Sequence, residues 1–166
     1  MQRCVLRSLT QFGAITAQGR SDPTDPMGFA FVNCRISGSS HPFLGRAWGD
    51  FSRVVYIHSS FDIHFDSQAW SDFGHTQRRS TSFYGMYKCK GLGAQIAMKS
   101  TWTKELTYQQ ARPFVDLSFI NGGNWIRPFS SVTIDAKNAL STRRGGRLRR
   151  ETQNTEQIQD DQSAYY

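Results

Sequence analysis

An arginine and a tryptophan stand two residues apart in the run 44–49, with glycines on both sides and the apolar run 54–57 close behind. Residues two apart on a β-strand point to the same face of a sheet, so Arg46 and Trp48 are predicted to project side by side. A guanidinium can hold a carboxylate, and an indole ring can lie flat against a sugar. The pair therefore indicates contact with an acidic polysaccharide, the alternative being a structural ion pair of Arg46.

The composition places these two residues in one domain that is rich in aromatic side chains. The chain has 166 residues, 13% of them aromatic, and a formal net charge of +7. This length suffices for one domain with a core and is too short for two. The positive charge suits an anionic partner, although non-specific attraction explains it as easily. The sequence contains no apolar stretch that would span a membrane and no signal-peptide pattern, and its three cysteines predict no disulfide framework.

Short β-like runs separated by glycine and proline turns must position the pair. They occupy residues 4–9, 14–18, 29–37, 43–48 and 53–59. Val5 and Phe29 are 24 residues apart, as are Phe31 and Val55. A period in the twenties with several short strands is typical of stacked β coils, and an antiparallel sandwich is the competing architecture.

The second half of the chain adds one strand, one short helix and a polar tail. The strand is expected at 82–87. Thr107 and Gln110 have the spacing of a capping box, which predicts a helix that ends at about Arg112, ahead of Pro113. Residues 126–166 include five arginines within 142–150 and then a run rich in glutamine, so we expect a disordered tail. Nucleic-acid binding by this tail is a weaker alternative to a solvated segment without a partner.

The histidines and the remaining aromatic residues offer weaker candidates for a site. His64 and Asp66 could share a strand face near His75, but no motif of a metal or nucleophile site accompanies them, so structural histidines and no metal are expected. The aromatic residues that could line a sugar groove are Trp70, Phe73, Phe83, Tyr84 and Tyr87. Only Trp70 is selected as a substrate contact. Trp102 and Trp125 are assigned to the core or to a lid over it.

Six segments in order resemble the pectinesterase (pectin methylesterase) family. They are GAITAQGR (13–20), GFAFVNCRI (28–36), LGRAW (44–48), FYGMY (83–87), GLGA (91–94) and LSFINGGNW (117–125). The segment 44–48 is similar to the LGRxW active-site motif of that family. The resemblance covers residues 1 to about 125, and the order of the segments makes it specific.

The resemblance implies an all-β fold, a right-handed parallel β-helix. Residues 1–125 would supply only its C-terminal coils with a short C-terminal helix, and 126–166 the tail. It implies a carboxylic ester hydrolase that releases methanol from galacturonate methyl esters of pectin without metal or cofactor. In the family, one aspartate attacks the ester, a second acts as acid and then base, and two glutamines hold the oxyanion. The motif arginine orients the nucleophile, and its tryptophan packs on the sugar.

Only Arg46 and Trp48 carry over from that set of residues. The family's aspartates and glutamines lie upstream of ITAQ in segments of the kinds QDTL and DFIFG, and neither is present in this sequence. We therefore expect a C-terminal portion that releases no methanol by itself and aggregates or is marginally stable. A non-catalytic remnant that binds polygalacturonate is the alternative function. The resemblance further implies an extracellular location in the cell wall, pectin (homogalacturonan) and a proteinaceous inhibitor as partners, and no nucleic acid.

Overall fold

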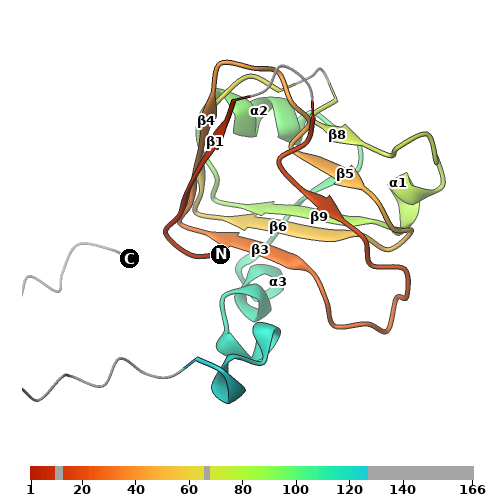
Figure 1. The fold of residues 1–166 in the computed structure, drawn as a ribbon, viewed down its shortest axis with the longest axis vertical. Helices are drawn as coiled ribbons and strands as arrows, with labels where there is room; N and C mark the ends of the chain where they lie inside the picture. Colours follow the sequence, from red (N-terminus) through yellow and green to blue (C-terminus); the bar gives the residue numbers. More distant parts are fainter. Residues whose placement is uncertain (10–12, 66–67, 127–166) are drawn as a thin grey trace, which may run out of the picture. The chain divides into compact units, whose positions relative to one another are not determined.

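Parallel β-sheets form the body of the protein in the computed structural model, which describes residues 1–9, 13–65 and 68–126 (Figure 1). The first sheet contains β1 (Val5–Ser8), β4 (Arg35–Gly38) and β7 (Ser60–Asp62). The second contains β2 (Ala17–Gln18), β5 (Gly45–Ala47) and β8 (Trp70–Ser71). The third contains β3 (Phe29–Val32), β6 (Arg53–Ile57), β9 (Phe83–Tyr87) and β10 (Thr103–Glu105). All strand pairs within the described residues are parallel, so the antiparallel sandwich is excluded.

The chain passes through the three sheets in the same order three times, and we call each passage a circuit. The circuits are β1–β2–β3, β4–β5–β6 and β7–β8–β9. Val5 lies opposite Arg35, and Phe29 lies opposite Val54, so one circuit takes about 25 to 30 residues. The expected period was therefore close in size. Val5 and Phe29, however, belong to different sheets, so they are not equivalent positions in successive circuits.

Each circuit turns from the third sheet into the first through one residue with left-handed backbone. The residues in this position are Asn33, His58 and Lys88, and the same conformation occurs at Arg3 ahead of β1, with φ between 47° and 53°. Asparagine and histidine are enriched in this region, whereas arginine and lysine seldom adopt it. A small residue follows each corner: Cys34 follows Asn33, and Ser59 follows His58. The Ser59 hydroxyl accepts a hydrogen bond from the Cys34 amide at 3.1 Å. Stacking of the circuits therefore sets these corners more than local preference does.

Aromatic rings fill the interior between the sheets in what we call the aromatic column. It consists of Phe31, Tyr56, Phe61, Trp70, Tyr84 and Trp102. Phe31 stacks on Tyr56 with ring centroids 4.7 Å apart, and Trp70 stacks on Tyr84 at 4.1 Å. The predicted core position of Trp102 is confirmed. Trp70 has no exposed surface, so its selection as a sugar contact was wrong.

Helix α2 (Leu92–Met98) lies at the end of the third circuit, where it packs against β7. A Cβ at Gly93 would come within 2.7 Å of the Ile63 carbonyl oxygen and of the Phe65 ring, so a glycine allows the close approach. The sequence did not predict this helix because Gly91, just ahead of it, and Gly93, within it, resemble a turn. At the first circuit, Val5 and Leu9 are 72% and 81% exposed. The expected aggregation stays a prediction.

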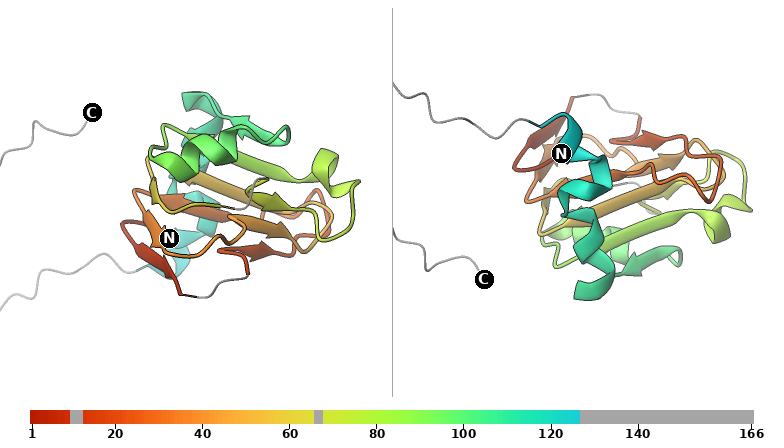
Figure 2. Two further views of the ribbon diagram at one scale, coloured as in Figure 1. Left: turned by 90° about the horizontal axis from the view of Figure 1, so that it is seen from above. Right: turned by 90° about the horizontal axis from the view of Figure 1, so that it is seen from below.

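Helix α3 (Tyr108–Ala111) begins at Thr107, whose capping box with Gln110 is confirmed. The short 3-10 helices η1 (Arg112–Phe114), η2 (Leu117–Ile120) and η3 (Gly122–Asn124) follow it. Together these four elements form a strap that crosses the outer face of the third sheet (Figure 2). Trp125 follows the strap and is 63% exposed, so it is not a core residue. The predicted tail lies almost wholly outside the described residues, none of whose helices is long and apolar enough to cross a membrane.

Candidate active-site face

Strand β5 carries Arg46 in the middle of the second sheet. Its neighbours Gly45 and Ala47 are buried, and the alternation of the strand turns the half-buried Arg46 outward. The amide of Arg46 donates to the Thr16 carbonyl oxygen at 2.8 Å. Trp48 directly follows the strand, and its amide donates to the Gln18 carbonyl oxygen at 3.1 Å. Parallel pairing with the first circuit therefore fixes the backbone on both sides of the candidate pair.

Phe73 joins the two residues into a single face. Its ring centroid lies 5.0 Å from the Arg46 Cζ and 5.0 Å from the centroid of the Trp48 ring, with an angle of 30° between the two aromatic planes. Trp48 is 56% exposed and Phe73 is 45% exposed. We call Arg46, Trp48 and Phe73 the arginine–aromatic face. It combines a cation over a ring with two apolar surfaces that solvent can reach.

Sequence reasoning counted Phe73 among the possible groove residues but selected Trp70 instead. The two residues differ in how they pair with the preceding circuit. Trp70 lies opposite Gly45, whose position faces the interior, and paired residues of parallel strands point the same way. Phe73 comes after the strand, where its left-handed backbone (φ 57°) turns the loop. No propensity rule predicts that conformation for phenylalanine.

The Arg46 guanidinium has an unmet hydrogen-bonding requirement. Its Nε atom is buried and has no hydrogen-bond partner among the described residues. The ion pairs formed by those residues are Arg35–Asp62, Arg78–Asp50 and Arg79–Asp72, and Arg46 takes part in none of them. A buried donor without a partner costs free energy. An anion placed over this face would supply the missing acceptor.

Helix α1 (Arg78–Thr81) holds both segments that carry the face. Arg78 donates to the Ala47 carbonyl oxygen and to the Asp50 carboxylate, each at 2.8 Å. Arg79 pairs with Asp72, next to Phe73, at 2.6 Å. Burial acts to raise the pKa of Asp72, but hydrogen bonds from Arg79 and the Gly74 amide outweigh it and lower that pKa. Arg78 therefore clamps the second circuit to the third, and Arg79 fixes the loop that carries Phe73.

Buried hydrogen bonds fix the turn that follows Trp48. The Gln18 side-chain oxygen accepts from the amides of Arg20 at 3.1 Å and Arg53 at 2.8 Å. The Ser52 hydroxyl lies within hydrogen-bonding distance of the carbonyl oxygens of Gln18 and Gly49, and it accepts from the Gly49 amide at 3.2 Å. A Cβ at Gly49 would overlap the backbone of residues 19 and 20, so only glycine fits there. This packing therefore fixes the backbone at Trp48 and leaves only its side chain free to rotate.

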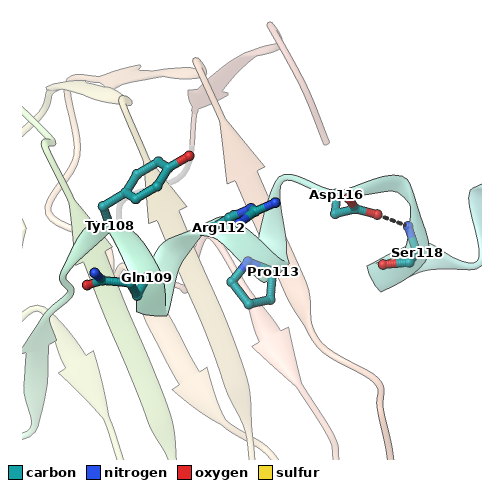
Figure 3. Close-up of a pocket in the computed structure, with 6 residues that line it drawn as sticks. All are labelled: Tyr108, Gln109, Arg112, Pro113, Asp116 and Ser118. Carbon is teal, nitrogen blue, oxygen red and sulfur yellow. Dashed lines mark hydrogen bonds between the residues drawn. The ribbon is translucent and has the colours of Figure 1, made fainter.

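Two depressions lie away from this face. One of about 390 Å³ sits on the strap (Figure 3) and is lined by Tyr108, Gln109, Arg112, Pro113, Asp116 and Ser118. The Ser118 amide donates to the Asp116 carboxylate at 2.7 Å and lowers the pKa of that group. Another, of about 440 Å³, lies over β1 and β4. Neither combines an unpaired buried donor with exposed aromatic rings, so the arginine–aromatic face is the better candidate.

Within the part of the chain that the structure describes, no three histidine, cysteine or acidic side chains gather in one place. His64 stacks on His41 and not on His75, and Asp66 lies outside the described residues. The thiol of Cys89 is buried, and this burial raises its pKa to about 11, so it is a poor nucleophile or ligand at neutral pH.

The fold agrees with comparisons to known proteins. The family model described as Pectinesterase matches residues 1–123, and the chain belongs to the pectinesterase family. Pectinesterase QRT1 of Arabidopsis thaliana is 39% identical over 127 residues, which cover 76% of this chain and 33% of that protein. The solved structure of pectin methylesterase from carrot matches with a TM-score of 0.66 and 29% identity, over 78% of this chain and 47% of the other. The chain thus spans a third to a half of the length of these relatives.

Proposed function

We propose that this chain is the arginine-bearing portion of a carboxylic ester hydrolase that acts on galacturonate methyl esters in pectin and releases methanol. The observation that carries the proposal is the buried, unpartnered Nε of Arg46 between two exposed aromatic rings. The circuits correspond in this proposal to the C-terminal coils of a right-handed parallel β-helix. The match to the carrot enzyme and the repeated order of the sheets support it.

The proposed chemistry divides into orientation and binding. A nucleophilic carboxylate must stay ionised and point at the ester carbonyl, and an adjacent guanidinium does both. Arg46 has a free donor for that carboxylate. Trp48 and Phe73 offer apolar surfaces on which a galacturonate ring packs through its C–H groups. The sequence contains no segment like QDTL or DFIFG, so we propose that the isolated chain orients and binds but does not turn over.

A second candidate function is binding of polygalacturonate without catalysis. Twenty lysines and arginines against thirteen acidic residues favour an acidic polymer as the partner. The arginine–aromatic face would serve this function without any missing residue. An extracellular location in the cell wall and recognition by an inhibitor protein are further proposals that come with the family. One relative from Arabidopsis thaliana carries both pectinesterase and pectinesterase inhibitor in its name.

Two measurements on the full chain separate these functions. The first is methanol release from highly esterified pectin, for which we expect no turnover. Clear turnover would overturn our assignment of the reacting carboxylates to segments that this sequence lacks. The second is affinity for esterified and de-esterified oligogalacturonides. The hydrolase portion should bind both forms, whereas a polygalacturonate-binding remnant should strongly prefer the acid.

Variants of the face test the site itself. Trp48→Ala and Phe73→Ala should each weaken oligogalacturonide binding about tenfold, because each removes a stacking surface. Arg46→Gln should weaken binding of the acid more than that of the ester. Trp125→Ala is the matched control, since that residue follows the strap and is 63% exposed. Equal losses in the Trp48 and Trp125 variants would show that binding occurs elsewhere.

A further inference from the structure

Two of the four histidines lie together on a surface that the proposed function does not use. The rings of His41 and His64 have centroids 5.7 Å apart and planes inclined by 27°. His41 lies between β4 and β5, and His64 lies between β7 and β8, so they occupy the same connection in consecutive circuits. Both residues are exposed. His58 and His75 lie elsewhere: His58 packs edge-on against Tyr87 at 5.3 Å, and His75 follows Phe73 in its loop.

The backbone under each ring is fixed by its buried neighbours. His41 stands between Ser40, which is 8% exposed and bonds to the Ser8 hydroxyl at 2.9 Å, and the buried Pro42. His64 stands between Ile63 and Phe65, each only 4% exposed. A ligand that joins the two rings therefore has to restrict side-chain rotation alone. That lowers the entropic cost of binding.

We propose that His41 and His64 form a bidentate site for a divalent transition-metal ion of the Ni²⁺, Cu²⁺ or Zn²⁺ class. A neutral imidazole nitrogen binds such ions at about 2.0–2.1 Å, and a small rotation of two exposed rings brings one nitrogen of each to a common ion. Hard cations such as Mg²⁺ and Ca²⁺ prefer oxygen ligands and are excluded. No third ligand gathers there among the described residues, so water completes the coordination sphere.

An ion bound in this way would tie the second circuit to the third. The two histidines are far apart in the unfolded chain, where an ion gains little from holding both. Preferential binding to the folded state raises stability by mass action. The order of affinity should follow the intrinsic order of these ions, with Cu²⁺ the tightest. This effect is independent of pectin and of Arg46.

The experiment titrates the full chain with Ni²⁺, followed by calorimetry and by the thermal midpoint of unfolding. Ni²⁺ is chosen because Cu²⁺ oxidises thiols, and the three cysteines are free. We expect one ion per chain and a rise in the thermal midpoint, with no response to Mg²⁺. His41→Ala and His64→Ala should each weaken affinity about tenfold or more, because each destroys the chelate. The double variant should lose no more than either single variant.

His58→Ala and His75→Ala are the matched controls and should bind Ni²⁺ as the unchanged chain does. Additive losses in the double variant would mean two separate sites and would overturn the proposal. So would a response that survives both single substitutions or disappears only when the cysteines are alkylated. If an alanine variant does not fold, His41→Gln or His64→Gln keeps a polar side chain without the ligand nitrogen and replaces it in the comparison.

Discussion

The guanidinium of Arg78 donates to the carbonyl oxygen of Ala47 at 2.8 Å, across 31 residues of sequence. Ala47 separates Arg46 from Trp48, so this single bond holds the peptide between the two motif residues. The Arg78 side chain is 12% exposed, and its second bond reaches Asp50. Helix α1 is only four residues long and buries none of its residues, so its role in the described structure is to present this arginine and Arg79.

Arg78→Ala should lower the free energy of unfolding by about 1–3 kcal/mol, because it leaves the Ala47 carbonyl and the Asp50 carboxylate without their partner. Urea denaturation measures the change. Arg35→Ala is the control. Arg35 and Asp62 form an exposed ion pair, with side chains 63% and 52% exposed, so its removal should cost less than about 1 kcal/mol. Equal losses of stability in the two variants would contradict the clamping role of Arg78.

Gly49→Ala should prevent the turn beneath Trp48 from closing. The added Cβ would lie 2.6 Å from the backbone carbon of Gly19, which directly follows the paired strand β2. We expect a loss of about 3 kcal/mol or more in the free energy of unfolding. Gly123→Ala has no heavy atom within 4 Å of the new Cβ and should change stability little. Similar thermal midpoints for the two variants would contradict the close approach at Gly49.

Tyr84→Phe should reduce the loss of stability at alkaline pH. Burial raises the pKa of Tyr84 and outweighs the opposite influence of Ser52 and Arg78. Because the folded pKa is the higher one, the contribution of Tyr84 is constant below the unfolded value near 10 and falls as the pH rises above it. Cys89, whose pKa burial raises to about 11, acts in the same direction from about pH 9 upward.

The same variant should cost little at neutral pH. The Tyr84 hydroxyl is buried without a hydrogen bond to any described residue, so losing it removes an unmet polar group. Denaturation at pH 7, 9 and 10.5 gives both results. Tyr108→Phe is the control, since Tyr108 is 62% exposed. An unchanged alkaline slope in the Tyr84 variant would exclude its phenol as a source of the pH dependence.

Thr107→Ala should shorten or fray the start of the strap. The Thr107 hydroxyl accepts from the Gln110 amide, while the Gln110 side chain accepts from the Thr107 amide at 2.9 Å. Loss of an N-cap costs about 0.5–2 kcal/mol. Thr107→Ser keeps the hydroxyl and should restore most of that stability, as read by the thermal midpoint. If serine does not rescue, the capping bond is not the cause.

Sequence reasoning predicted the features that depend on local chemistry. The capping box at Thr107 needs only two side chains at a fixed spacing, and the strands need only apolar runs between turns. The outward position of Arg46 follows from strand alternation on β5. Each of these can be read within a few neighbouring residues.

The features that failed depend on which circuit lies above which. Val5 and Phe29 have the right spacing for a repeat but belong to different sheets. Trp70 and Phe73 differ only by three positions, yet register with Gly45 buries one and leaves the other exposed. The corner at Lys88 adopts a backbone that lysine seldom chooses. All three features are decided by contacts with residues that lie 25 to 30 positions away in the sequence.

The aromatic column gives the protein an optical signature of its own folding. Trp70 and Tyr84 stack at 4.1 Å within a rigid, asymmetric interior, and Trp102 lies 5.3 Å from the same tyrosine. Fixed aromatic pairs produce strong near-ultraviolet circular dichroism, which vanishes when side-chain packing is lost even if secondary structure persists. Light absorbed by the column therefore reports on whether the circuits are stacked in register, without any label attached to the chain.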